Sequence, residues 1–156
     1  MGAAGRTGLI GPVMRSADRS GSPPFRLLDR QRRYVLDLGQ IAAFLVRFTR
    51  ELQPAGSFTV VLISDRAMRP YNRRYRGQDR TTDVLSFEGD DAYLGDILIS
   101  ADMARRQWSG SRTLAFETYI GRLALHGLLH LMGYDHETDD GEMRDLETRL
   151  RRRFRC

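Results

Sequence analysis

The chain has 156 residues and a formal net charge of +5, and all 25 of its lysine-plus-arginine positions are arginine. A chain of this length is expected to form one compact domain with a buried core, and its basic excess suits a polyanionic partner such as RNA. A single cysteine excludes an intramolecular disulfide framework and suits a reducing compartment. Apolar runs fall short of the roughly 20 residues that span a bilayer, so we expect a cytoplasmic protein without a membrane partner.

The first 24 residues are rich in glycine, serine and other small side chains and have no clear hydrophobic period. We expect residues 1–24 to form a disordered extension and residues 25–156 to form the folded domain. Three arginines and a single acid in the extension leave an organellar transit peptide as an alternative. No amphipathic helix is evident there, which favours the plain extension.

Hydrophobic patterning predicts an α+β fold. Continuous apolar, β-branched runs predict strands, and apolar residues at three- and four-residue steps predict helices. The predicted strands are residues 25–28, 58–63, 83–87 and 94–99. The predicted helices are residues 37–52 with Asp37 as N-cap, 65–75, 101–108, 113–132, and a last helix capped within residues 138–140. We therefore expect a small mixed β-sheet of about four strands, packed with helices around a buried fourth helix.

The predicted helix over residues 65–75 contains Pro70, so it either begins at that proline or is kinked there. Residues 71–80 carry four arginines interleaved with two tyrosines. Arginine offers a planar fork for phosphate, and tyrosine offers a stacking face for an unpaired base. The predicted RNA-binding residues are Arg73, Arg74, Tyr75 and Arg80. A solvated helix face accounts for the same composition equally well.

All three histidines of the chain fall within eleven residues, which read His-Gly-Leu-Leu-His-Leu-Met-Gly-Tyr-Asp-His. His126 and His130 are one helical turn apart and can direct two imidazoles at one point. On an unbroken helix His136 would lie about 15 Å along the axis from His126. The helix must therefore stop before it, and Gly133 is the residue that can close a helix in the left-handed conformation.

Two histidines on an apolar helix are more often ordinary core or surface residues than metal ligands. Here the residues that lead into the break, 123–132, include no acidic or basic side chain apart from the histidines, which indicates burial. Burying imidazoles without partners is costly. Three imidazoles with a free fourth position are typical of catalytic zinc, because structural sites are usually closed and rich in thiolates. We therefore predict that His126, His130 and His136 bind one Zn²⁺ ion.

Two known motifs share this outline. The metzincin peptidase pattern, His-Glu-x-x-His-x-x-Gly-x-x-His, has the same histidines and glycine, but Gly127 stands where those peptidases carry their general base. The full string, His-Gly-x-Leu-His-Leu-x-Gly-Tyr-Asp-His, resembles the signature of the bacterial YbeY family of zinc-dependent endoribonucleases. Three further blocks extend the resemblance to most of residues 25–154: Asn72-x-x-Tyr75-Arg76-Gly77-x-Asp79, Thr82-Asp83-Val84-Leu85-Ser86-Phe87 and Leu94-Gly95-Asp96-Ile97.

The resemblance implies a single-strand-specific endoribonuclease that matures the 3′ end of small-subunit rRNA and acts in ribosome quality control in the bacterial cytoplasm. It implies the three histidines as zinc ligands, Arg76 as an arginine near the metal that matters for cleavage, and the ribosome or its associated proteins as further partners. A zinc-bound water has a pKa near 7, which would allow hydrolysis without a dedicated base. Asp135 is a candidate to orient a ligand, although a turn residue before His136 is an equal alternative.

Two other functions remain open on the residues alone. One is a metzincin-like zinc peptidase, which needs a base that this motif lacks. The other is a non-catalytic ribosome-binding module that a structural zinc stabilises.

Overall fold

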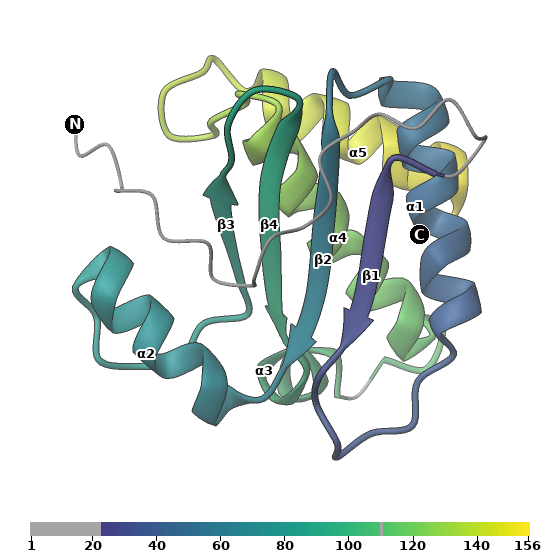
Figure 1. Ribbon diagram of the computed structural model, residues 1–156. Helices are drawn as coiled ribbons and strands as arrows, with labels where there is room; N and C mark the ends of the chain where they lie inside the picture. Colours follow the sequence, from purple (N-terminus) through teal and green to yellow (C-terminus); the bar gives the residue numbers. More distant parts are fainter. Residues whose placement is uncertain (1–22, 110) are drawn as a thin grey trace.

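Four strands form one mixed sheet in the order β1-β2-β4-β3, in a computed structural model that describes residues 23–109 and 111–156 (Figure 1). The strands are β1 (Phe25–Asp29), β2 (Ser57–Ile63), β3 (Val84–Glu88) and β4 (Tyr93–Ser100). The helices are α1 (Leu38–Leu52), α2 (Asp65–Arg76), α3 (Ala101–Trp108), α4 (Phe116–Leu131) and α5 (Glu142–Phe154). The predicted α+β class and four-strand mixed sheet are confirmed. The predicted extension, residues 1–24, lies almost wholly outside the described residues.

The pairing of the strands shows which side chains lie on the face of the sheet that packs against α4. Strands β1, β2 and β4 run parallel, and β3 pairs antiparallel with β4. In this register Val60 of β2 and Ser86 of β3 both pair with Ile97 of β4. Paired residues point to the same side of a sheet. The three side chains therefore form a row across the face on which α4 packs.

Helix α4 is buried because it lies between the sheet and three other helices. It contacts α1, α3, α5, β3 and β4, and the larger apolar core joins its side chains to those of the three helices and the sheet. Figure 1 shows α4 and α5 behind the strands. A smaller core on the other face of the sheet joins Met68 of α2 to Val61, Leu85 and Leu98. The helix that carries two histidines is thus the central helix of the domain, as predicted.

The boundary of α1 follows the predicted cap. The Asp37 carboxylate accepts a hydrogen bond of 3.0 Å from the Gln40 amide, which satisfies one of the free N–H groups of the first turn. The side chains of Ile41, Leu45 and Phe48 are fully buried. These residues recur on one face of the helix, so their burial follows from the apolar stripe.

The structure corrects the predicted start of one helix and decides between the two alternatives left open for another. Helix α4 begins at Phe116 and not at residue 113. The backbone before it is already hydrogen-bonded to side chains: Trp108 donates to the Leu114 carbonyl at 2.6 Å, and Ser111 accepts from the Leu114 amide at 3.1 Å. Helix α2 begins at Asp65, where Ser64 caps it. The alternative in which this helix starts at Pro70 is therefore wrong, and the proline lies inside it.

The last helix follows its predicted capping segment closely. Helix α5 begins after Gly141, whose φ is +93°. Asp139 accepts hydrogen bonds from the Gly141 amide at 2.8 Å and from the Met143 amide at 3.0 Å. The capping side chain thus comes from the predicted residues 138–140, although the helix starts two residues further on. Within the described part of the chain, no helix is long and apolar enough to cross a membrane.

Candidate metal centre

The end of α4 bends the chain so that His136 can return to the other two histidines. The helix stops at Leu131, and Gly133 follows with a φ of +95°. The Gly133 amide donates to the His130 carbonyl, and the Tyr134 amide donates to the Leu129 carbonyl, both at 3.0 Å. This pair of hydrogen bonds is the Schellman arrangement, in which a left-handed residue, usually glycine, closes a helix. The predicted helix stop at Gly133 is confirmed.

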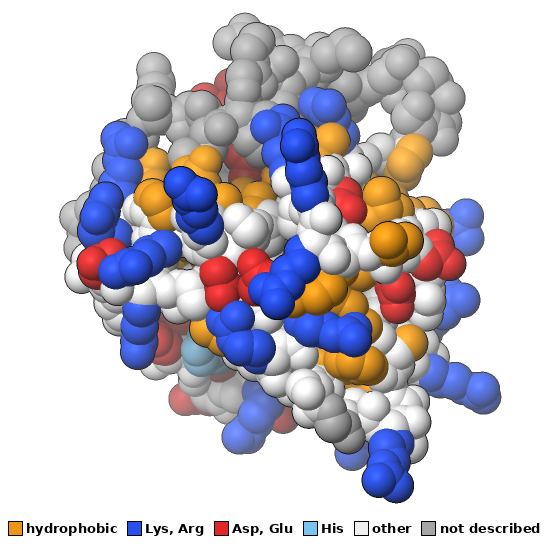
Figure 2. Space-filling view, turned by 90° about the horizontal axis from the view of Figure 1, so that it is seen from below, with side chains coloured by type: hydrophobic (Ala, Val, Ile, Leu, Met, Phe, Trp, Pro, Cys, Tyr) orange, Lys and Arg blue, Asp and Glu red, His pale blue; other side chains and the backbone are white. Residues whose placement is uncertain are grey.

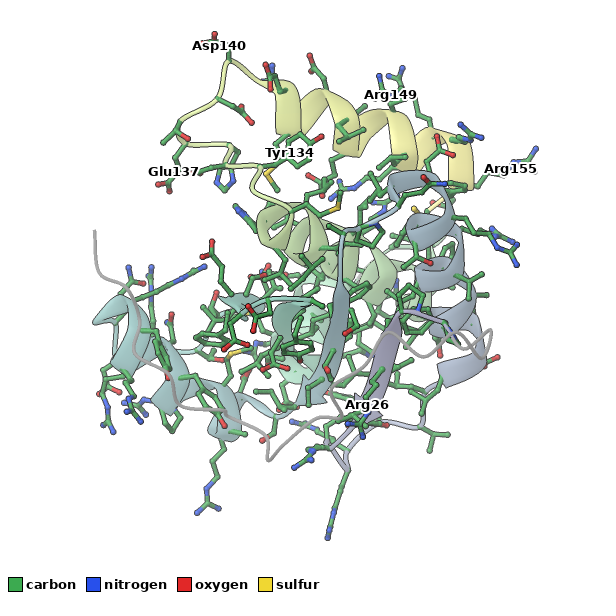
Figure 3. The ribbon with its side chains drawn as sticks, turned by 45° about the horizontal axis from the view of Figure 1, so that its top comes forward. Arg26, Tyr134, Glu137, Asp140, Arg149 and Arg155 are labelled. Carbon is green, nitrogen blue, oxygen red and sulfur yellow. The ribbon has the colours of Figure 1, made fainter. Side chains whose placement is uncertain are left out.

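The three histidine side chains converge beyond this turn. Nitrogen atoms of His126, His130 and His136 all lie within 4.8 Å of one another, and the Nε2 atoms of His126 and His130 are 3.1 Å apart. In the described part of the chain, no other histidine, cysteine or acidic side chain joins the group. Figure 3 shows the loop of Tyr134, Glu137 and Asp140 projecting beyond the end of α4. His136 is exposed, whereas His126 and His130 are half-buried.

The donor set fits a transition-metal ion. A tetrahedral zinc ion with bonds of about 2.0 to 2.1 Å holds its nitrogens about 3.3 to 3.4 Å apart, and the 3.1 Å between the Nε2 atoms is close to that value. Imidazole is also the ligand type that zinc, copper, iron and nickel share. The three histidines could therefore hold a metal ion, as the spacing predicted.

Burial favours the neutral, metal-binding form of one of these rings. Burial lowers the pKa of His130, and the neighbouring rings of His126 and His136 lower it further. The nearby Asp135 carboxylate and a hydrogen bond to the Tyr134 backbone act in the opposite direction but do not outweigh them. A neutral imidazole keeps a lone pair for a cation. The environment of His130 therefore prepares it as a ligand near neutral pH.

A glutamate that sequence reasoning missed lies beside the first histidine. Oε2 of Glu147, in α5, is 3.4 Å from Nδ1 of His126, and Oε1 accepts a hydrogen bond of 2.6 Å from Arg151. Burial alone would raise the pKa of Glu147, but the hydrogen bond with His126 and the charge of Arg151 outweigh it and lower that pKa. One signal was available: Glu147 lies four residues after Met143 and three before Leu150, both buried, so it stands on the apolar face of α5.

The Asp135 carboxylate contacts the turn. It accepts a hydrogen bond of 3.0 Å from the Glu137 amide, and this bond, followed by one from Thr138, lowers its pKa. Among the described residues, no hydrogen bond joins Asp135 to a histidine ring. The nearby His130 and His136 rings also lower its pKa through their charge. The orienting role predicted for Asp135 stays a prediction, and its turn contacts are explained without it.

Gly127 explains why a peptidase-type base is missing from this helix. A Cβ atom at Gly127 would lie 2.5 Å from Cγ2 of Ile97 and 3.0 Å from the Ser86 hydroxyl oxygen. That hydroxyl also donates to the Gly127 carbonyl at 3.1 Å. Position 127 therefore faces the sheet at close range, and a glutamate side chain could not enter there without displacing the Ile97 and Ser86 side chains.

The residues proposed for RNA lie on and after α2. Arg76 ends the helix and is exposed, and no hydrogen bond or ion pair within the described residues joins it to the histidines. The Arg74 guanidinium lies 5.7 Å from the centre of the Tyr75 ring, which packs edge-on against Phe87 at 4.6 Å. Tyr75 thus has a packing role besides any contact with a base.

Two of the predicted RNA-binding residues share an open hollow of about 870 Å³ beside α2. Its cationic lining consists of Arg66, Arg69, Arg73 and Arg80. Asp79 forms two hydrogen bonds with Arg69, at 2.9 and 3.0 Å, and lies 4.0 Å from Arg73. Arginine side chains are spread over the face in Figure 2, with fewer acidic side chains among them. Against four arginines the lining carries two acidic residues, Asp79 and Asp65, so the hollow has a positive excess that suits an anion.

Comparisons with known proteins point to one family. The model of the family described as "Endoribonuclease YbeY" matches residues 30–155. A relative of that description from Wolinella succinogenes is 46% identical over 98 residues, which cover 61% of this chain and 69% of the relative. One from Geobacter metallireducens is 36% identical over 138 residues, which cover 82% and 91%.

A solved structure is similar as well. The solution structure of a protein from Thermotoga maritima matches with a TM-score of 0.55 and 28% identity, over 84% of this chain and 91% of that one. The family match spans every helix of the domain and the strands β2, β3 and β4, and it begins directly after β1. The chain belongs to the endoribonuclease YbeY family.

Proposed function

We propose that this chain is a metallo-endoribonuclease that hydrolyses phosphodiester bonds of single-stranded RNA at one zinc ion held by His126, His130 and His136. The observation that carries the proposal is the convergence of three imidazoles within 4.8 Å, in a chain that belongs to a family described as endoribonucleases. Zinc is favoured because three histidines and an open side are typical of catalytic zinc.

A bound zinc ion would supply Lewis-acid chemistry, polarising a phosphoryl oxygen and acidifying water at neutral pH. The chain's own residues hold that ion and position the substrate. The Arg76 guanidinium clamps the scissile phosphate and stabilises the negative charge that grows on its oxygens in the transition state. Arginine suits this task because its planar fork can donate two parallel hydrogen bonds to one phosphate.

The arginine-lined hollow supports a path for the RNA strand beside α2. Arg73 and Arg80 line it with Arg66 and Arg69, and phosphate contacts of this kind fix a strand without reading its sequence. Near the end of α2, Tyr75 adds a partly exposed ring and Arg74 adds a further cation. The biological role that we propose is maturation of the 3′ end of small-subunit rRNA and ribosome quality control, with the ribosome as partner.

The decisive experiment measures metal content and RNA cleavage together on the parent chain and on Arg76→Ala. We expect the parent to carry about one zinc per chain and to cut single-stranded RNA. Arg76→Ala should keep its zinc and lose roughly 10²- to 10³-fold in rate, as for the loss of one transition-state donor. Arg149→Ala on α5 is the matched control and should cut normally. Equal rates for Arg76→Ala and the parent would refute the clamp.

The alternatives give different results in the same assays. A zinc peptidase would cut casein, but it needs a base where Gly127 packs on Ile97 and Ser86. A ribosome-binding module with structural zinc would unfold when His130 is replaced by alanine and would not cut RNA in any form. A catalytic centre predicts that His130→Ala stays folded and loses cleavage.

A further inference from the structure

Glu147 links the C-terminal helix to the metal centre, although it lies 21 positions after His126 in the chain. Its side chain is 12% exposed, and each carboxylate oxygen has its own partner. Oε2 lies 3.4 Å from Nδ1 of His126, and Oε1 accepts from Arg151 at 2.6 Å. A buried carboxylate needs such partners because removing a charge from water is unfavourable.

This contact decides which nitrogen of His126 carries the proton. A neutral imidazole has one N–H and one lone pair, and an ionised carboxylate can only accept. A hydrogen bond to Glu147 therefore requires the proton on Nδ1. The lone pair is then on Nε2, which is the atom that lies 3.1 Å from Nε2 of His130. The glutamate thus turns the free lone pair of His126 toward the other ligands.

We propose that Glu147 is a positioning residue of the metal centre: it fixes the tautomer and the ring orientation of His126, and Arg151 holds it in place from the next turn of α5. This inference rests on the proposed function, because it assumes that the three histidines bind a metal. Carboxylates in this position strengthen binding through the ring they orient. Metal affinity therefore depends on the docking of α5 against α4.

The arrangement also explains the charge pattern of α5. Glu147 and Arg151 are four residues apart and form an ion pair along the helix. Arg151 compensates the carboxylate on the side away from the histidine. Without Arg151, Oε1 of the carboxylate would lose this hydrogen bond.

The test uses Glu147→Gln in the full chain, with two readouts besides cleavage. The first is the His126 tautomer in the metal-free chain at mildly alkaline pH, from ¹⁵N NMR shifts of the ring. We expect Nδ1–H in the parent and a shift toward Nε2–H in Glu147→Gln. The second is the zinc dissociation constant by competition with a chromophoric chelator, which should weaken by roughly 10- to 100-fold.

Asp145→Asn is the matched control, because it removes one negative charge from the same helix at a side chain that is 80% exposed. It should change neither readout. Arg151→Met should weaken zinc binding less than Glu147→Gln does, since the carboxylate remains. Thermal unfolding of each metal-free variant separates lost positioning from lost folding.

Two results would overturn the proposal: Nε2–H on His126 in the metal-free parent, or unchanged zinc affinity in a folded Glu147→Gln. The tautomer of the parent decides the matter even if the variant does not fold. Failure of the proposed function looks different, because the parent would then bind zinc with the expected His126 tautomer and still not cut RNA.

Discussion

At the residue scale, Gly127 determines how closely α4 approaches the sheet. The row of Val60, Ser86 and Ile97 runs beneath it, and the Ser86 hydroxyl donates to its carbonyl at 3.1 Å. Gly127 thereby sets the distance of α4 from the sheet, and with it the position of the histidines on either side. A missing side chain thus contributes to the geometry of the metal centre.

Gly127→Ala should destabilise the protein. The new Cβ would lie 2.5 Å from Cγ2 of the buried Ile97, and overpacking of this kind typically costs about 1–3 kcal/mol. Alanine recovers up to about 1 kcal/mol through its higher helix propensity. We therefore expect a net loss of about 1–2 kcal/mol in the free energy of unfolding, measured by urea denaturation.

A double-mutant cycle isolates the cause. In an Ile97→Ala background the clash is removed, so Gly127→Ala should cost much less there than in the parent. Equal costs in both backgrounds would show that contact with Ile97 does not limit how closely α4 approaches the sheet.

At the element scale, Asp65 joins three segments that lie far apart in the sequence. This first residue of α2 accepts hydrogen bonds from Ser100 at the end of β4 at 2.5 Å, from Arg106 of α3 at 2.6 Å, and from Thr81 at 3.0 Å. Burial opposes ionisation, but these hydrogen bonds outweigh it and lower the pKa of Asp65 below its usual value. The carboxylate therefore fixes α2 to the sheet and to α3.

Asp65→Asn should remove this stabilisation in a pH-dependent way. A folded-state pKa below the unfolded value of about 3.9 contributes stability above that value and loses it as pH falls through the folded pKa. We expect a cost of about 1.5–3 kcal/mol at neutral pH, as for hydrogen bonds to a charged group. Denaturant unfolding should show the cost shrinking below pH about 4. Asp145→Asn is the exposed control, and a pH-independent cost for Asp65→Asn would contradict the linkage.

At the scale of the whole molecule, arginines cluster on separate surfaces. One set lines the hollow beside α2. Another lies on α5 and directly after it, where Figure 3 shows Arg149 and Arg155 pointing outward. Helix α2 belongs to the core on one face of the sheet, and α5 belongs to the core on the other face, where it packs on α4 and α1. A single strand that passes beside α2 would therefore meet the first set and leave the second exposed.

Salt dependence distinguishes these two sets. Each phosphate contact to single-stranded RNA adds about −0.7 to the slope of log affinity against log salt. The double variant Arg66→Ala/Arg80→Ala should reduce the magnitude of this slope by roughly 1–2 and weaken binding of all sequences alike. Arg149→Ala/Arg155→Ala should leave the slope unchanged. The reverse result would place the RNA along α5. Both double variants are made in the Arg76→Ala protein, which is zinc-loaded but cleavage-deficient. Fluorescence anisotropy with a labelled oligonucleotide measures their RNA affinity at each salt concentration.

Local patterns predicted much of the fold and the histidine part of the site. The cap at Asp37, the apolar stripe of α1 and the stop at Gly133 depend on neighbours within about one turn, so the sequence alone contains their cause. The start of α4 was misplaced because Trp108 and Ser111, which delay it, act through side-chain bonds to Leu114. Nothing in the local period reveals such bonds.

By itself, the sequence determined which residues can bind a metal and where the helix must break, since a four-residue spacing and a glycine act over a few ångströms of chain. Only the tertiary structure decided that Glu147 meets His126, that position 127 faces Ile97, and that Arg66 and Arg69 share a hollow with Arg80. These contacts join segments whose separation along the chain carries no periodic signal. They form only when the helices have packed on the sheet.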